Sequence, residues 1–181
     1  LHAQVPLVEE ILAALGVPVI RAEGFEADDV MATLAEQCSR EKRGCYIVSG
    51  DKDLLQLVDP PVYVLKPEKS GFTQLDQEGV REYLGVEPER VVDYLALTGD
   101  SSDNVPGVAG VGPKTAVSLL QEFGTLDGIY DHLDDISSKS RKEKLEASRD
   151  EAYASRELVI LKRDLDLGYP PEKLRFEAFH A

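Results

Sequence analysis

The sequence predicts an α/β fold: a parallel sheet flanked by helices, followed by a helix-hairpin-helix and a C-terminal helical region. Two observations predict it. In the first half, short apolar runs alternate with segments whose apolar residues recur at helical spacing, the pattern of a parallel sheet. In the second half, the glycine-rich stretch Val105–Thr115 joins two helical patterns. We therefore expect an α/β core in residues 1–97 and a helix-hairpin-helix with a helical region in residues 98–181.

The chain opens with a predicted helix and a predicted strand. Apolar residues at helical spacing predict a helix over Val5–Leu15, which Gly16 ends. The short run Val17–Arg21 contains Pro18 and predicts a strand at a sheet edge, because proline donates no ladder hydrogen bond. A second helix is expected over residues 24–43.

The middle of the chain predicts the rest of the sheet. Cys45–Ser49 is a compact apolar run between two glycines, so we expect a buried parallel strand. Two further apolar runs separated by a turn predict a hairpin, and three segments with helical patterns surround it. The hairpin comprises Val62–Leu65 and Phe72–Leu75, and the helices comprise Leu54–Val58, Asp76–Leu84 with Asp76 as N-cap, and Pro88–Leu97.

The second half is predicted to be almost entirely helical. Pro113 stands at a helix start, where a missing N–H costs nothing, and this helix covers residues 114–123 and ends at Gly124. Thr125 caps the next helix, which runs to about Leu133. A long charged helical region covers residues 138–161. The tail from Asp164 is predicted as a loop with one short helix.

Charge and cysteine content limit the possible functions. The net charge of -14 argues against a general nucleic-acid binder, because such proteins are usually basic. No apolar run is long enough for a membrane span, and no signal peptide is visible. Cys38 and Cys45 lack disulfide or metal spacing, so we expect two reduced thiols in a cytoplasmic protein. Because the chain begins at Leu1 inside a helical pattern, we also expect a fragment whose natural start lies upstream.

Three groups of acidic residues stand out. Each group alone has a structural explanation as helix caps, first-turn charges or turn residues. The first two groups, however, follow predicted parallel strands, so they would meet at one edge of the sheet. If the hairpin packs over that edge, up to seven carboxylates converge, and so many like charges need a counter-charge. The groups are Glu26, Asp28 and Asp29; Asp51 and Asp53; and Asp100 and Asp103.

These carboxylates favour a particular kind of metal. An all-oxygen ligand set without a Cys/His cluster is typical of the hard cations Mg²⁺ or Mn²⁺. Two such ions about 4 Å apart would clamp the attacking and leaving oxygens of a phosphodiester, and one of them would lower the pKa of the attacking water.

The glycine-rich hairpin fits the same substrate. Gly110 and Gly112 let the backbone approach an anion, and the N-terminus of the following helix favours negative charge. Lys114 and Thr115 add a cation and a hydroxyl. A phosphate-loop NTPase is excluded, because Pro113 stands between the glycine and the lysine. A plain helix-turn-helix with a glycine turn remains the alternative.

Three stretches of this sequence occur in an order and spacing typical of one family. They are Gly24-Phe25-Glu26-Ala27-Asp28-Asp29-Val30, Ser49-Gly50-Asp51-Lys52-Asp53-Leu54-Leu55-Gln56-Leu57, and Leu97 to Val108 continuing through Lys114-Thr115-Ala116. Together they resemble the 5′-nuclease domain of bacterial DNA polymerase I, which is similar to flap endonucleases more widely. The resemblance covers nearly the whole chain. It implies a PIN-like α/β fold with a helix-three-turn-helix, and an enzyme that removes 5′ flaps and RNA primers from duplex DNA in repair and replication.

The resemblance also implies roles for single residues. Asp28, Asp51, Asp53 and Asp103 would be catalytic metal ligands, together with Glu26 and Asp29, and Asp100 would be an additional acidic position. The hairpin would hold the duplex backbone, in some family members with a bound K⁺. The implied DNA contacts are Gly107, Val108, Gly110, Val111, Gly112, Lys114 and Thr115.

The resemblance further implies segments outside this sequence. The family's first strand with its metal-binding Asp, a second such strand and a basic helical arch would precede Leu1, and polymerase domains would follow Ala181. We therefore expect a monomer that binds DNA with a 5′ flap or 5′ end and that cleaves it slowly or not at all on its own.

Two alternatives stay open: a non-cleaving, structure-specific DNA-binding module of the same fold, and a PIN-type ribonuclease. The presence of all three acidic groups favours a nuclease over the module, and the hairpin favours duplex DNA over RNA. A basic cluster is a further candidate for phosphate contact, although such clusters are more often a solvated helix face. It consists of Lys139, Arg141, Lys142 and Lys144.

Overall fold

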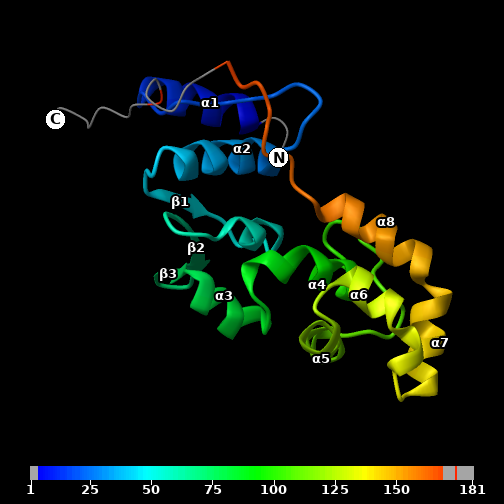
Figure 1. The fold of residues 1–181 in the computed structure, drawn as a ribbon. Coiled ribbons are helices and arrows are strands. Elements are labelled where there is room, and N and C mark those ends of the chain that lie inside the picture. Colours follow the sequence, from blue (N-terminus) through cyan, green and yellow to red (C-terminus); the bar gives the residue numbers. More distant parts are fainter. Residues whose placement is uncertain (1–3, 169–173, 175–181) are drawn as a thin grey trace.

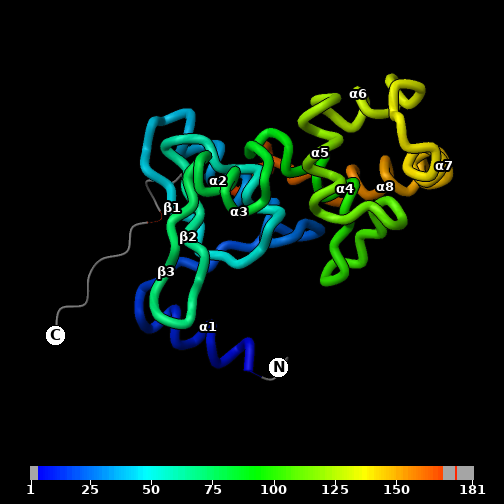
Figure 2. Tube along the Cα trace, turned by 90° about the horizontal axis from the view of Figure 1, so that it is seen from below, coloured from blue at the N-terminus to red at the C-terminus, as the bar shows by residue number. Residues whose placement is uncertain are grey.

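The computed structural model describes residues 4–168 and 174, and it confirms an α/β fold with a small sheet flanked by helices. Figures 1 and 2 show two parts. The sheet with α1, α2 and α3 forms one, and α4 to α8 form the other. One continuous cluster of buried apolar side chains runs through both parts.

The sheet is mixed rather than purely parallel. Its order is β1-β2-β3, and the pairing of β1 with β2 is parallel whereas that of β2 with β3 is antiparallel. The predicted hairpin is confirmed, and its strands are slightly longer than expected. The strands are β1 (Cys45–Val48), β2 (Val62–Glu68) and β3 (Gly71–Leu75).

The expectation that β1 is buried was wrong for one of its faces. Ile47 is buried, whereas Tyr46 and Val48 are 56% and 57% exposed. Successive side chains of a strand point to opposite faces, and in the described residues only the Ile47 face packs against the core. Tyr46 stacks on Tyr63 of β2, with ring centroids 5.4 Å apart.

The strand predicted over Val17–Arg21 is not formed. This segment has no regular secondary structure, and it pairs with no strand in the part of the chain that the structure describes. A strand is stabilised by ladder bonds to a neighbour, and Pro18 has no N–H to offer one. The helix before it, α1 (Val5–Ala14), forms as predicted but contains no buried residue.

Helices α2 and α3 and the turn η2 carry the rest of the first part. α2 (Ala27–Arg40) ends three residues earlier than predicted, and Lys42 follows in the left-handed region with φ 55°. The short helix after β1 is the 3₁₀ turn η2 (Asp53–Leu57). In α3 (Gln77–Leu84) the N-cap is confirmed, because Asp76 accepts a hydrogen bond from the Gly79 amide at 2.9 Å.

The second part is helical, as predicted, with two differences. The long region expected over residues 138–161 is two helices that meet at Ser148, and the helix expected from Pro88 begins with a 3₁₀ turn. The Thr125 cap is confirmed by its hydrogen bond from Gly128. The elements are η3 (Pro88–Arg90), α4 (Val91–Thr98), α5 (Pro113–Phe123), α6 (Leu126–Asp131), η4 (Leu133–Asp135), α7 (Lys139–Ala147) and α8 (Arg149–Val159).

The C-terminal tail was predicted to contain a short helix. Residues 164–168 form none, and the rest of that prediction falls on residues 169–181, which, except for residue 174, lie outside the described residues. No helix among the described residues is long and apolar enough to span a membrane. Cys38 and Cys45 are both free thiols. The domain boundary at residue 97 stays a prediction.

Candidate metal and nucleic-acid site

The first acidic group begins α2. Glu26 and Asp29 form a capping box, in which the two side chains and the two backbone amides satisfy each other. The Asp29 carboxylate also accepts a hydrogen bond from the Lys162 amide at 2.9 Å. Both Asp29 oxygens therefore bind backbone N–H groups, whereas Asp28, beside it, is partly buried and available to a ligand.

The second acidic group follows β1. Asp51 accepts a hydrogen bond from the Asp53 amide at 3.1 Å, which fixes the turn between the two residues. The Oδ1 atom of Asp53 is buried and has no hydrogen-bond partner among the described residues. A buried carboxylate oxygen without a partner is costly, so this atom indicates a place where a cation or a proton would be held.

The third acidic group lies between α4 and α5. Asp100 is 8% exposed, and both of its oxygens are engaged: Oδ2 accepts from Lys52 Nζ at 3.0 Å and Oδ1 from the Ser102 amide at 2.8 Å. The Lys52 hydrogen bond is the main cause that holds the pKa of Asp100 below its usual value. Asp103, in contrast, is exposed.

The structure brings the three groups together. Burial raises the pKa of Asp53 to about 7, and the neighbouring charges that add to the rise come from all three groups: Asp51, Asp103, Asp100 and Asp28. Burial also raises the pKa of Asp28, with further contributions from Asp51, Glu26, Asp103 and Asp29. The groups therefore meet although the strand expected before the first one is absent, because the N-terminus of α2 itself lies beside the end of β1.

The donor chemistry of this cluster fits a hard divalent cation. All donors are carboxylate oxygens, and one of them is buried without a partner. The spacing is more open than a coordination sphere, since no three Asp, Glu, His or Cys side chains of the described residues converge in ligand geometry. Within the part of the chain that the structure describes, no hydrogen-bond donor engages both oxygens of Asp28, Asp51, Asp53 or Asp103. Asp29 and Asp100, in contrast, have both oxygens engaged.

The glycine-rich hairpin starts where the Asp103 loop ends. Gly99 and Gly107 close the base of that loop, with φ of 69° and 65°. A Cβ on Gly107 would lie 2.3 Å from the Gly99 nitrogen, so the backbones approach as closely as only glycine permits. Pro113 opens α5 as predicted. In the described structure the amides of Gly110, Gly112 and Lys114 donate to no protein acceptor and are available to an anion.

The structure separates the basic cluster of α7 into different roles. Lys139 pairs with Glu143, and Lys142 pairs with Asp134 and Glu146. Lys144 forms no ion pair with the described residues. Its ammonium lies against the hairpin, only 2.7 Å from where a Cβ on Gly110 would be.

In the sequence, Lys144 is one of four basic residues in a cluster, and nothing there distinguishes it from the other three. Lys144 lies far from the hairpin in the sequence, and only the way α7 folds back places it there.

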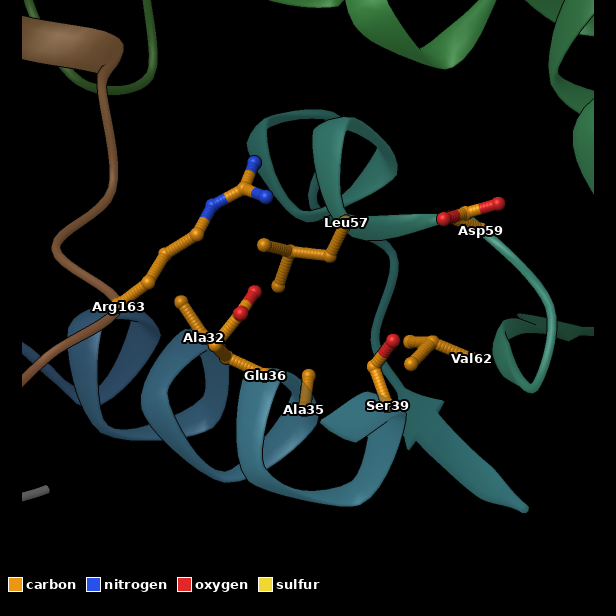
Figure 3. Close-up of a pocket in the computed structure, with 8 residues that line it drawn as sticks. All are labelled: Ala32, Ala35, Glu36, Ser39, Leu57, Asp59, Val62 and Arg163. Atoms are coloured by element: carbon orange, nitrogen blue, oxygen red, sulfur yellow. The ribbon is translucent and has the colours of Figure 1, made fainter. Parts of the chain in front are cut away.

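A small cavity of about 50 Å³ lies elsewhere. Figure 3 shows it between α2, η2 and Arg163, and none of the seven carboxylates of the three groups lines it. It is therefore separate from the candidate site.

Family models match the whole length of the chain. A model described as 5'-3' exonuclease, C-terminal SAM fold, matches residues 86–181, and one described as 5'-3' exonuclease, N-terminal resolvase-like domain, matches residues 1–85. The chain belongs to the 5'-3' exonuclease family.

Curated relatives agree with this membership. The chain is 48% identical to DNA polymerase I of Treponema pallidum over 166 residues, which are 91% of this chain and 16% of the polymerase. It is 42% identical to a 5'-3' exonuclease of Aquifex aeolicus over 178 residues, which are 98% of this chain and 59% of that protein. The chain thus spans less than two thirds of the length of these relatives.

Solved structures show the same fold. A flap endonuclease of bacteriophage T5, solved as a pseudo-enzyme–product complex with DNA and metal ions, superposes with a TM-score of 0.74 at 24% identity, covering 84% of this chain and 56% of the phage protein. The catalytic core of Rad2 in complex with DNA substrate superposes with a TM-score of 0.62 at 22% identity, covering 91% of this chain and 57% of that core.

Proposed function

We propose that this exonuclease-family chain is part of a divalent-cation-dependent 5′-3′ exonuclease or 5′-flap endonuclease that hydrolyses phosphodiester bonds in DNA. The observation that carries the proposal is the buried Asp53 oxygen without a hydrogen-bond partner, set among carboxylates from three segments. The relatives named DNA polymerase I and 5'-3' exonuclease, and the solved structures with DNA and metal ions, support it.

In this proposal the hairpin would bind the DNA phosphates and the carboxylates would bind the cation. The free amides of Gly110, Gly112 and Lys114 and the Lys114 ammonium would hold the phosphate backbone of a duplex, with Gly107, Val108, Val111 and Thr115 shaping that surface. Asp28, Asp51, Asp53 and Asp103 would hold Mg²⁺ or Mn²⁺ close to the bound phosphate. Such cations supply activation of water and neutralisation of the leaving oxygen.

Asp29, Glu26 and Asp100 have a different place in this proposal. Asp29 and Glu26 fix the start of α2, and Asp100 fixes the Asp103 loop through Lys52. They would fix the backbone that carries the metal ligands without binding the metal themselves, as residues next to a metal site commonly do.

Binding of a labelled 5′-flap duplex tests the proposal. We expect flap-selective binding in Ca²⁺, weaker binding in EDTA, and weaker binding of a blunt duplex under both conditions. Ca²⁺ is chosen so that the test does not depend on turnover. The variant Asp51→Asn should lose the Ca²⁺ enhancement and retain the fold by circular dichroism. Equal binding of flap and blunt duplexes, or full enhancement in Asp51→Asn, would contradict the proposal.

The open spacing of the carboxylates favours a second candidate, a DNA-binding module that does not cleave. Incubation of the flap duplex with Mn²⁺ separates the two, because only the nuclease releases a shortened product. The other alternative, a PIN-type ribonuclease, would bind RNA. Competition with single-stranded RNA tests it in the same assay.

Further features belong to the same proposal. They are a K⁺ ion at the hairpin, a monomeric state, a cytoplasmic location and polymerase domains in the same polypeptide. Sedimentation analysis tests the monomer. Duplex binding in K⁺ compared with Li⁺ tests the hairpin ion, since replacement of K⁺ by the smaller ion should weaken the hairpin contact.

A further inference from the structure

The hairpin and the Asp103 loop share one fixed point, Gly107. The loop is closed at its base by backbone hydrogen bonds in both directions between Asp100 and Val105, at 2.8 and 3.0 Å. The Val108 amide donates to the Leu97 carbonyl at 2.9 Å, which ties the start of the hairpin to α4. Because Gly107 stands between these two sets of bonds, its position sets where the hairpin begins relative to Asp103.

A buried hydroxyl of α8 holds Gly107. The Gly107 amide donates to Ser155 Oγ at 2.9 Å, and Ser155 is 0% exposed. Water therefore cannot replace this acceptor, and the amide would be left without a partner if the hydroxyl were removed. Ser155 belongs to α8, and α8 packs against α4.

The segment that contains Ser155 continues to the carboxylates. Four residues on, the Val159 carbonyl accepts from Gln56 Nε2 at 2.8 Å, and the same Gln56 nitrogen donates to the Asp53 carbonyl at 2.9 Å. Next, Arg163 donates to the Gln56 carbonyl at 3.1 Å, and Figure 3 shows its guanidinium extending towards η2. The Lys162 amide binds Asp29. One continuous segment, residues 155–163, thus contacts the hairpin, η2 beside Asp53, and the start of α2.

We propose that Ser155 is a positioning residue for DNA binding. Through Gly107 it holds the hairpin at a set place relative to the carboxylates, to which the same 155–163 segment is anchored by Gln56 and Asp29. The inference rests on the proposed function. It adds that the 155–163 segment keeps the hairpin and the cation site at a fixed distance and orientation. Both can therefore bind one DNA molecule at the same time, so each contact strengthens the other.

The variant Ser155→Ala tests the inference, with Ser148→Ala as the matched control. Ser148 is also buried and lies at the start of the same helix, but its hydroxyl makes no hydrogen bond with the described residues. A third variant, Ser155→Cys, keeps a weak acceptor of similar size. For each protein three quantities are measured: the Ca²⁺ affinity without DNA, the flap-duplex Kd in Ca²⁺ and in EDTA, and amide hydrogen exchange at Gly107.

The decisive quantity is the factor by which Ca²⁺ tightens duplex binding. Loss of one hydrogen bond that aligns two contacts should lower this factor by roughly fivefold in Ser155→Ala. Gly107 exchange should become faster, while the Ca²⁺ affinity without DNA stays within about twofold of the wild type. Ser155→Cys should be intermediate, and Ser148→Ala should match the wild type.

The possible failures are distinct. If Ser155→Ala keeps the wild-type enhancement factor, or if its Ca²⁺ affinity without DNA falls as much as its duplex affinity, Ser155 has only a general structural role and the inference is overturned. If the wild type binds no duplex at all, the proposed function is contradicted and this inference falls with it.

Discussion

The region around Asp53 and the loop around Asp100 lie against each other, but they shift the pKa values of their carboxylates in opposite directions. Burial and four neighbouring carboxylates raise the pKa of Asp53 to about 7. Asp100 is also buried, yet its pKa is lowered, because Lys52 and the Ser102 amide bind its two oxygens. Burial therefore does not decide the charge of these groups; the presence of a donor does.

The same division recurs in the first acidic group. Asp29 has both oxygens bound to backbone amides, whereas the pKa of its neighbour Asp28 is raised by burial and by the other carboxylates. Two neighbouring acidic residues thus serve different purposes. One fixes the backbone, and the other is held in an unfavourable charged environment that a cation would relieve. We infer that the hydrogen bonds of Asp29 and Asp100 hold the backbone in place and so keep the other carboxylates close together despite their mutual repulsion.

The largest effect, a loss of Ca²⁺ affinity, is expected from neutralising the exposed carboxylate of the third acidic group. Asp103→Asn should lower Ca²⁺ affinity on the order of tenfold or more, because the charge count of the ligands sets affinity for a hard cation, and it should leave the melting temperature unchanged. Asp100→Asn should lower stability and change Ca²⁺ affinity less. Isothermal titration and thermal unfolding measure the two quantities. A loss of Ca²⁺ affinity in Asp100→Asn as great as in Asp103→Asn would make Asp100 a ligand.

The second prediction concerns pH without divalent cations. Asp53 has a folded-state pKa of about 7 against an ordinary value of 3.8. The folded state therefore binds more protons than the unfolded state between those values, so stability should fall as the pH rises through this window. Added Ca²⁺ should raise the melting temperature more above pH 7 than near pH 4, because it competes with protons.

Asp53→Asn is the control for this pH dependence. The neutral amide removes the titrating group, so the melting temperature of the variant should vary less with pH in the same window. A variant whose melting temperature follows the same pH profile as the wild type would assign the effect to other groups.

A smaller effect is expected at Lys52. Lys52→Met would leave Asp100 buried with one partner fewer, and the Asp100 pKa should return towards its usual value. Because Lys52 is 43% exposed, solvent weakens the pair, and we expect a loss of about 1 kcal/mol in the free energy of unfolding. Urea denaturation measures it. The comparison variant Lys139→Met removes a pair with Glu143 in which both side chains are more exposed, 90% and 62%, and it should change stability less.

Local signals in the sequence predicted the fold well. The caps at Asp76 and Thr125 and the start of α5 at Pro113 depend only on residues a few positions apart, and all three are confirmed. The strand predicted over Val17–Arg21 failed for the opposite reason, because a strand requires a partner that local pattern does not reveal. The break between α7 and α8 at Ser148 carries no glycine or proline signal in the sequence.

The candidate site divides in the same way. The three acidic groups stand out in the sequence because each is a short motif. Their sorting into bonded and free carboxylates depends on distant residues, since the partner of Asp100 lies 48 positions away and that of Asp29 lies 133 positions away. Ser155 was missed, and Gln56 was given no role although it stands in the second family stretch, because their contacts exist only once α8 packs against the rest.

The smallest predicted effect distinguishes two lysines of α7. Lys144 lies against Gly110 without an ion pair to the described residues, so Lys144→Ala should weaken duplex binding about threefold and lower the salt dependence by about one released counterion. Lys139 pairs with Glu143 and is the control, for which Lys139→Ala should change neither quantity. Duplex titrations at several salt concentrations measure both.

If the two variants behave alike, the helix face as a whole attracts DNA through its charge and Lys144 makes no separate contact beside the hairpin. If only Lys144→Ala responds, the DNA-binding surface extends from the hairpin onto α7, which carries no residue of the three acidic groups.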